Sequence, residues 1–170
     1  MKIDSIHRIM VLGDEGTGKT ALIKKFAPEK ISDYAKPRIG VPIYTKIFKM
    51  DEKTREVIIW ECEKGYGPGD PMCKKFSEEA SGIILIFDLT TQDTFNSLET
   101  WIGEVKNCIG SIPTVLVGNK KDLAGERKIT PETGQSKAKQ LNLPYMEASA
   151  STGENVPEMF THLISLIESK

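Results

Sequence analysis

The sequence predicts an α/β fold of three layers, in which a mostly parallel sheet of six strands carries helices on both faces and one antiparallel strand at its edge. Three observations predict it. Apolar runs alternate with segments of helical periodicity through most of the chain. Residues 82–88 are almost continuously apolar, as in a parallel strand that is covered on both faces. Residues 41–50 and 56–60 flank a short polar turn, which predicts a hairpin and hence the antiparallel strand.

The bulk composition predicts a single domain that spans residues 1–170 and is long enough to bury a core. A net charge of −1 gives no reason to expect nucleic acid as a partner. Three cysteines without metal-ligand spacing predict free thiols in a reducing cytoplasm. No apolar stretch approaches the length of a membrane span, and the chain ends without a cysteine for prenylation. We therefore expect a cytoplasmic monomer that is peripheral at membranes only if a lipidated tail follows Lys170 in the native chain.

The middle of the chain contains two long loops around the predicted hairpin. Residues 28–40 are polar and contain two prolines, which predicts a long loop. Pro42 either marks the start of the next strand or places that strand at a sheet edge. Residues 51–54 are predicted to be the hairpin turn. Three glycines and two prolines within 61–72 predict a second loop, which a short polar helix through Ala80 follows.

The second half of the chain alternates helices with strands. Thr130 and Pro131 are typical of a helix cap and a first helical turn. In order, the predicted elements are a helix over 94–108, a strand over 113–118, the helix that Thr130 opens, a strand over 144–147, and a C-terminal helix with an apolar stripe from Val156 to Ile167.

Residues 13–20, Gly-Asp-Glu-Gly-Thr-Gly-Lys-Thr, match the phosphate-loop pattern GxxxxGK[ST]. A predicted strand over 6–12 precedes them and a helix follows, and these flanks favour a phosphate loop over a chance glycine-rich turn. Glycines let backbone N–H groups turn toward an anion, and the helix N-terminus adds partial positive charge. Lys19 would neutralise the β- and γ-phosphates, and the Thr20 hydroxyl would ligate Mg²⁺. The predicted nucleotide-binding residues here are Asp14, Glu15, Gly16, Thr17, Gly18, Lys19, Thr20 and Ala21.

Two later loops carry groups that suit a guanine base. The Asp122 carboxylate can accept hydrogen bonds from the guanine N1–H and exocyclic amine, a donor pair that adenine lacks. We expect Asn119 to brace the phosphate loop, the Lys120 stem to cover the base, and backbone N–H groups of 148–151 to reach the guanine O6. Taken alone, each short motif would predict only a polar turn. Because the motifs follow successive strands of the predicted sheet, however, we expect them to meet at one edge of it. The predicted base-side residues are Asn119, Lys120, Asp122, Leu123, Ser149, Ala150 and Ser151.

With these motifs in this order, the sequence resembles the Ras superfamily of small GTPases over nearly the whole chain, and the Rab branch within it. Residues 82–90, Phe95-Asn96-Ser97-Leu98 and Ile39-Gly40-Val41 are similar to Rab sequence. The resemblance implies the P-loop NTPase fold, bound GTP or GDP, Mg²⁺ and a molecular switch. It also implies effector and regulator proteins that contact the loops 31–42 and 61–80.

Three departures from the family pattern surround the expected γ-phosphate. Arg38 stands where the family has a Mg²⁺-binding threonine, and it either contacts phosphate or points to solvent. The second departure is the family's Asp-x-x-Gly pattern with its following glutamine: Glu61 replaces the aspartate and would hold Mg²⁺ directly or through a water. The glutamine that orients the attacking water in Ras is absent, because the possible alignments put Gly65 or Tyr66 there. Glu15 is the third departure, since the family has a small residue at that position.

A carboxylate beside the γ-phosphate is repulsive: two like unit charges ~4 Å apart at an effective dielectric of ~20 cost about 4 kcal/mol, and less if the Glu15 side chain turns to solvent. We assign no catalytic residue, although Lys19, Arg38, Gly65 and Tyr66 are expected near the γ-phosphate. These features predict guanine-nucleotide binding with slow or impaired hydrolysis. The alternative is a pseudo-GTPase that serves as a protein-interaction module, with nucleotide as a structural cofactor or with none. A third alternative, an ATP-using kinase, is disfavoured by the two base-side loops.

Overall fold

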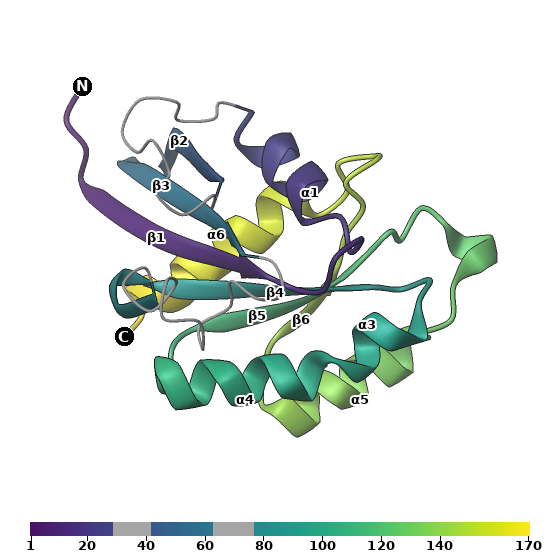
Figure 1. The fold of residues 1–170 in the computed structure, drawn as a ribbon. Helices are drawn as coiled ribbons and strands as arrows, with labels where there is room; N and C mark the ends of the chain where they lie inside the picture. The colour runs from purple at the N-terminus through teal and green to yellow at the C-terminus, as the bar shows by residue number, and fades with distance from the viewer. Residues whose placement is uncertain (29–41, 63–76) are drawn as a thin grey trace.

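The computed structural model describes residues 1–28, 42–62 and 77–170. In these ranges a six-stranded sheet lies between two layers of helices (Figure 1). The strands are β1 (Ser5–Leu12), β2 (Ile43–Met50), β3 (Lys53–Cys62), β4 (Gly82–Asp88), β5 (Thr114–Asn119) and β6 (Tyr145–Glu147). The helices are α1 (Lys19–Phe26), α3 (Gln92–Asn96), α4 (Leu98–Cys108), α5 (Pro131–Leu141) and α6 (Val156–Glu168), with a 3₁₀ turn, η1, at Ala124–Glu126.

The strand order is β2-β3-β1-β4-β5-β6, and every neighbouring pair is parallel except β2 and β3. The predicted fold class is therefore confirmed, including the single antiparallel strand at the edge. All seven residues of β4 are buried, as their continuous apolar run predicts for a central strand.

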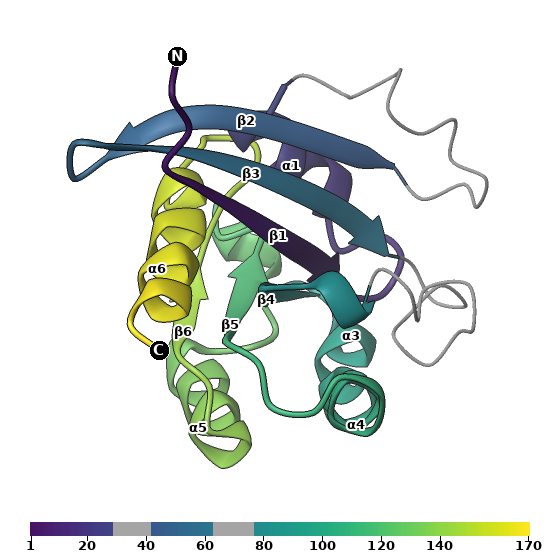
Figure 2. The same ribbon diagram turned by 90° about the vertical axis from the view of Figure 1, so that its left-hand side faces the viewer.

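Each face of the sheet has its own apolar core. Helices α1 and α6 cover one face, where Phe26 stacks on Phe160 with ring centroids 4.1 Å apart (Figure 1). Helices α3, α4 and α5 lie on the other face, where Phe87 of β4 meets Phe95 of α3 edge to face. The view in Figure 2 shows α6 on one side of the strands and α4 on the other. Alternate side chains of β1 reach opposite cores, with Ile9 and Val11 in one and Met10 and Leu12 in the other, which is why residues 9–12 are all apolar.

Several predicted boundaries were wrong. The hairpin turn is only Asp51 and Glu52, both with positive φ (51° and 61°), so Lys53 and Thr54 already belong to β3. A two-residue turn of this kind matches the twist of the flanking strands. Glu61 and Cys62, which composition assigned to a loop, end β3. The predicted helix over 94–108 is divided at Ser97, whose hydroxyl donates to the Asp93 carbonyl.

Helix α5 begins as its sequence predicts. The Thr130 side chain accepts a hydrogen bond from Thr133 N at 3.1 Å, and Pro131 occupies the first turn, where it sacrifices no intrahelical bond. Asn142 ends the helix in the left-handed conformation (φ 57°). The short helix predicted through Ala80 falls mostly outside the described residues, and residues 77–79 are helical.

An ion pair between a buried arginine and a partly exposed glutamate joins the C-terminal end of α6 to the sheet, far from the carboxyl ends of the strands. Arg55 is 2% exposed and binds the Glu168 carboxylate in a bidentate manner, with Nε–Oε1 and Nη2–Oε2 distances of 2.9 and 2.8 Å. His7 Nε2 lies 3.0 Å from Oε1 of the same carboxylate. The hydrogen bonds from Arg55 lower the pKa of Glu168 to about 2. No local pattern predicts this partner for His7, because the three residues come from β1, β3 and α6.

Candidate functional site

The predicted site residues that the structure describes lie on loops at the edge of the sheet where the parallel strands end (Figure 1). Residues 13–20 follow β1, Glu61 is the penultimate residue of β3, Asn119 ends β5, and the loop after β6 begins at Ala148. Parallel strands place their carboxyl ends at the same edge, so loops distant in sequence become neighbours.

The phosphate loop is shaped by glycines that no other residue can replace without a shift. Gly13 (φ +152°) and Gly18 (φ +91°) both have positive φ. A Cβ at Gly13 would lie 2.3 Å from the Ile86 carbonyl oxygen of β4, and one at Gly18 would lie 2.4 Å from Asn119 Nδ2. The loop backbone therefore packs directly on β4 and on the end of β5, and the cradle is closed by contacts that exclude a side chain.

Lys19 crosses back over the loop that precedes it. The side chain is buried, with 3% of the residue exposed, and Nζ donates to the carbonyls of Gly13 at 2.8 Å and Asp14 at 2.9 Å. These bonds hold an ammonium group at the mouth of the cradle, next to the N-terminus of α1. Lys19 and Thr20 are themselves the first residues of α1, so the predicted helix start at Ala21 was late by two residues.

Thr20 and Glu61 form a pair of oxygen ligands suited to a hard cation. The Thr20 hydroxyl donates to Glu61 Oε1, and the Glu61 residue is 4% exposed. A hydroxyl that donates its proton to a carboxylate keeps its lone pairs free for a metal ion. No group of three or more His, Cys, Asp or Glu side chains could hold a metal among residues 1–28, 42–62 and 77–170. The pair fits Mg²⁺, which typically takes one or two protein ligands together with phosphate oxygens and waters.

Tyr44 of β2 is 3% exposed, and its side chain projects from the same face of the sheet as that of Glu61. Burial, followed by the charge and hydrogen bonding of the Glu61 carboxylate, raises the pKa of the Tyr44 hydroxyl. The hydroxyl therefore stays protonated at neutral pH. Sequence reasoning missed Tyr44, although the hairpin register that pairs it with Ile59 places it diagonally across from Glu61.

Asn119 joins the phosphate loop to the base-side loop. Its Nδ2 donates to the Thr17 carbonyl at 2.8 Å, and its Oδ1 accepts from Ala150 N at 3.3 Å. The side chain is buried, with 1% of the residue exposed. The structure thus brings Asn119 to the phosphate loop, as the sequence led us to expect, and adds the link to Ala150.

Lys120 has positive φ (68°) and makes two contacts across the site. Its Nζ donates to the Gly16 carbonyl at 2.9 Å and lies 2.7 Å from the Asp88 carboxylate at the end of β4. The ammonium group is thereby held at the phosphate loop, and the aliphatic stem spans the space between the two loops. Asp88 was not among the predicted site residues.

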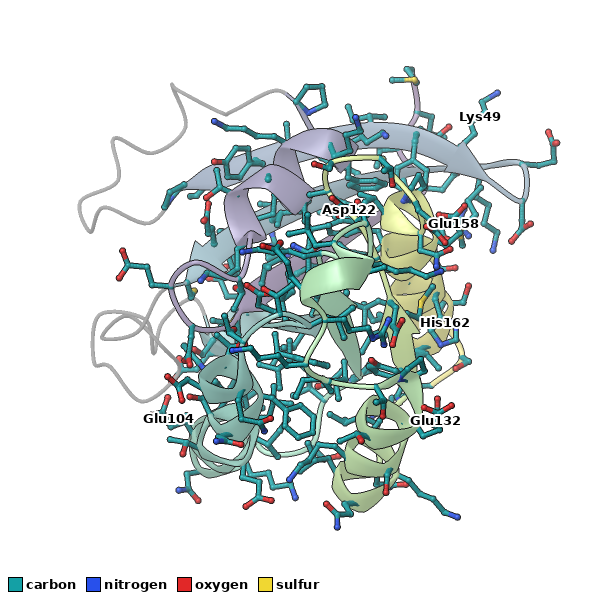
Figure 3. All side chains as sticks on the ribbon, turned by 90° about the vertical axis from the view of Figure 1, so that its right-hand side faces the viewer. Lys49, Glu104, Asp122, Glu132, Glu158 and His162 are labelled. Atoms are coloured by element: carbon teal, nitrogen blue, oxygen red, sulfur yellow. The ribbon has the colours of Figure 1, made fainter. Side chains whose placement is uncertain are left out.

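Asp122 is fixed by the loop after β6. Ser149 Oγ donates to Asp122 Oδ1 at 2.7 Å and accepts from Thr152 N at 3.1 Å, and Ser149 is buried. Asp122 itself is exposed, and Figure 3 shows it beside the loop that precedes α6. Its second carboxylate oxygen has room to accept from a ligand. Leu123 and Ser151 lie on the same rim and are exposed.

The remaining predicted site residues divide into two groups. Glu15, Gly16, Thr20 and Ala21 are exposed at the rim of the phosphate loop and α1. Arg38, Gly65 and Tyr66, expected near a γ-phosphate, lie outside the described residues. One further contact was not predicted: Trp101 Nε1 donates to Asp14 Oδ1 at 2.9 Å. The helical spacing of residues 94–108 holds no signal for this polar partner of Trp101.

None of the helices within the described ranges is long and apolar enough to cross a bilayer.

Comparison with known proteins matches residues 8–169 to the Ras family. A Ras-related protein Rab-1 of Theileria parva is 33% identical over 169 residues, which cover 98% of this chain and 76% of that protein. The Ras-related protein Rab-1D of Dictyostelium discoideum is 32% identical over 168 residues, covering 98% and 82% respectively. The GTP-binding protein YPTM2 of Zea mays is 29% identical over 168 residues, with the same coverage as Rab-1D. The strand-end site and this similarity along almost the whole chain agree, and the protein belongs to the Ras family as a Rab-like small GTPase.

Proposed function

We propose that this protein binds GDP and GTP together with Mg²⁺ and acts as a Rab-like molecular switch whose intrinsic GTP hydrolysis is slow. The observation that carries the proposal is the Asn119 side chain, which bonds the Thr17 carbonyl of the phosphate loop and the Ala150 amide of the base-side loop. This bridge fixes the distance between a phosphate site and a base site, as recognition of a whole nucleotide requires.

Each part of a guanine nucleotide has a group of this chain that would hold it. Lys19 and the loop amides would bind the β-phosphate, and Thr20 with Glu61 would hold Mg²⁺. Asp122, already fixed by Ser149, would accept from the guanine N1–H and amine. Adenine would cover the carboxylate without offering those donors, and a polar group that a ligand covers without a partner is costly. The proposal is supported by the name of the maize relative, which describes that protein as GTP-binding.

The slow hydrolysis is inferred from the groups around the γ-phosphate. Glu15 is exposed at the rim of the loop, where its negative charge would repel the γ-phosphate. Glu61 carries one methylene more than an aspartate, which changes where its carboxylate meets the metal site. The family's water-orienting glutamine corresponds to Gly65 or Tyr66, and neither offers the amide that orients water in Ras.

We further propose that residues 1–170 act as a single monomeric domain in the cytoplasm. Effectors and regulators would contact the loops 31–42 and 61–80, because these flank the γ-phosphate position and only contacts that differ between GDP and GTP can shift a conformational equilibrium. Peripheral attachment to membranes would need a lipidated tail beyond Lys170, as the resemblance to Rab proteins suggests.

The proposal is tested by nucleotide binding and by single-turnover hydrolysis on the same preparation. We expect tight binding of fluorescent GDP and GTP that weakens when EDTA removes Mg²⁺, and no comparable binding of ADP. We expect phosphate release from bound GTP to be at least about tenfold slower than for a Rab-1 relative measured alongside. Release as fast as the relative would refute slow hydrolysis while leaving nucleotide binding intact.

The protein-interaction module remains the competing interpretation, and the same samples separate it from the switch. A switch binds GDP and GTP in different conformations, so amide hydrogen exchange in the loops 31–42 and 61–80 should differ between the two complexes. Equal affinity for both nucleotides with identical exchange would favour a module that uses nucleotide only for stability. Absence of any guanine-nucleotide binding would favour a module with no ligand.

A further inference from the structure

The carboxyl end of β4 holds both ends of the loop that connects β5 to α5. Leu89 N donates to the Asn119 carbonyl at 3.0 Å, where the loop leaves β5. The Leu89 carbonyl accepts from Lys128 N at 2.8 Å and from Ile129 N at 3.1 Å, where the loop returns. The loop is therefore closed against β4, and Asp88, the last residue of that strand, adds a side-chain contact to the same loop.

The Asp88 carboxylate is buried, and each of its oxygens has a partner. The residue is 2% exposed. Its Oδ1 accepts hydrogen bonds from Thr90 N at 2.8 Å and from Thr90 Oγ1 at 2.6 Å. Its Oδ2 lies 2.7 Å from Lys120 Nζ. A buried carboxylate is costly unless it is paired and hydrogen-bonded. Because Thr90 fixes one oxygen, the other is directed at the Lys120 ammonium group.

Lys120 needs such an anchor. Its side chain is 33% exposed, and fixing the ammonium group removes the rotamer freedom of a four-carbon stem. Its backbone has a φ of 68°, a left-handed conformation that is strained for a residue with a Cβ. The ion pair with Asp88 offsets part of both costs. Without this pair, the ammonium group is free to turn toward solvent.

The Lys120 ammonium group in turn acts on the phosphate loop. Its Nζ donates to the Gly16 carbonyl at 2.9 Å, and Asn119 Nδ2 donates to the next carbonyl, that of Thr17, at 2.8 Å. In a trans peptide the C=O and the N–H point in opposite directions. The two bonds therefore fix the orientation of two successive peptide groups in the loop whose amides would bind phosphate.

We propose that Asp88 is a positioning residue for nucleotide retention, whose carboxylate holds the Lys120 ammonium group on the Gly16 carbonyl. Asp88 acts through Lys120 and not on the nucleotide, because Thr90 and Lys120 occupy its two oxygens. This inference rests on the proposed binding of guanine nucleotide. It implies that removing a negative charge beside an anion-binding loop weakens the retention of an anionic ligand.

The test is the rate of GDP release from the whole chain carrying Asp88→Asn, which keeps the size of the side chain and removes its charge. The new amide can still accept from Thr90, but its NH₂ group would face the Lys120 ammonium group and displace it from Gly16. We expect fluorescent GDP to be released about tenfold faster, as the loss of one hydrogen bond between charged groups implies. The acceleration should persist in EDTA, because the contact does not involve Mg²⁺. Asp88→Ser gives the same comparison if Asp88→Asn does not fold.

Asp93→Asn is the matched control. Asp93 is an exposed carboxylate of α3, so the variant makes the same change of charge close to Asp88 in the chain. We expect it to leave GDP release unchanged. Lys120→Met removes the ammonium group and keeps most of the aliphatic stem. In that background Asp88→Asn should cause little further acceleration, because the two residues act through the same contact.

The outcomes distinguish the two proposals. Unchanged or slower release from Asp88→Asn would overturn the role of Asp88 and leave the proposed function standing, and slower release is what simple repulsion between Asp88 and the phosphates predicts. That role would also be overturned if Asp93→Asn accelerates release equally, if the acceleration vanishes in EDTA, or if it persists undiminished with Lys120→Met. A wild-type chain that binds no guanine nucleotide would overturn the proposed function and this inference with it.

Discussion

Trp101 Nε1 donates a hydrogen bond to Asp14 Oδ1 at 2.9 Å, across 87 positions of sequence. Trp101 is 5% exposed and packs with the core between the sheet and α4, so its indole is fixed by that helix. Asp14 is the second residue of the phosphate loop. The conformation of the loop is therefore coupled to a helix that lies on the opposite face of the sheet from α1.

Trp101→Phe should loosen the phosphate loop. It removes the indole donor and part of the buried ring, and we expect about 2 kcal/mol lower unfolding free energy and a several-fold faster release of bound GDP. Urea unfolding and fluorescent GDP release measure the two effects. Asp14→Ala removes the same bond from the other side, so its effect on release should not add to that of Trp101→Phe. Full additivity would mean that the bond does not connect the helix to nucleotide retention.

Gly18→Ala and Gly16→Ala separate steric clash from backbone strain. Both glycines have positive φ, +91° and +81°, but a Cβ at Gly18 would lie 2.4 Å from Asn119 Nδ2, whereas one at Gly16 meets nothing within 4 Å. We expect Gly16→Ala to cost about 1 kcal/mol of stability from strain alone. Gly18→Ala should cost about 2 kcal/mol more and abolish GDP binding, because Asn119 must move away from Thr17. Thermal unfolding and calorimetric GDP titration provide the comparison, and equal costs for the two variants would refute it.

Asp122→Asn should change which base is accepted. The amide replaces one carboxylate oxygen by a donor that faces the guanine amine, so GDP affinity should fall by about 100-fold or more. Xanthosine diphosphate presents an oxygen in place of that amine and should bind the variant better than it binds the wild type. Competition against fluorescent GDP measures both affinities, with ADP as the reference that neither protein should prefer. Unchanged GDP affinity would show that Asp122 does not contact the base.

Glu168→Gln should remove a pH-dependent part of the stability. The Glu168 pKa of about 2 is below the ordinary value of 4.5, so the folded state favours the ionised carboxylate. The stabilisation is complete above about pH 4.5 and is lost as the pH falls toward 2. With 30% of the side chain exposed and the charge partly screened, we expect about 1–2 kcal/mol at pH 7.

Urea unfolding at pH 7 and pH 3 tests this expectation. The difference between the wild type and Glu168→Gln should shrink at the lower pH. Glu158→Gln is the matched control, because Glu158 is an exposed glutamate on the same helix (Figure 3). A difference that stays constant between the two pH values would show that the carboxylate charge is not what Arg55 and His7 require.

The fold class was predictable because its signals are local. The apolar run of β4 and the cap of α5 at Thr130 depend on neighbouring residues, and both are found where the sequence predicts them. Boundaries were less predictable. Glu61 and Cys62 look like loop residues because glycines and prolines follow them, but pairing with β1 extends β3 through both. Hydrogen bonding to a neighbouring strand decides where a strand ends, and a single sequence does not display it.

The residues of the candidate site divide in the same way, into those that a local motif predicts and those that only the fold brings together. The phosphate loop and the Asn119 motif have fixed spacing, so their residues could be named in advance. Trp101 and Asp88 could not, because their polar contacts join elements far apart in the chain. A tryptophan in an amphipathic pattern is predicted to be buried, and only the fold reveals the polar group that its indole N–H meets.

The bidentate pair between Arg55 and Glu168 has a mechanical consequence. The chain terminus after α6 lies at the far end of the sheet from the loops that contain Lys19 and Asp122 (Figure 1). Tension applied there would pass through the Glu168 carboxylate into β1 and β3, where long strand pairs resist it in shear. A molecule tethered to a surface by that terminus would hold its pocket outward and unstrained, ready to meet freely diffusing ligands.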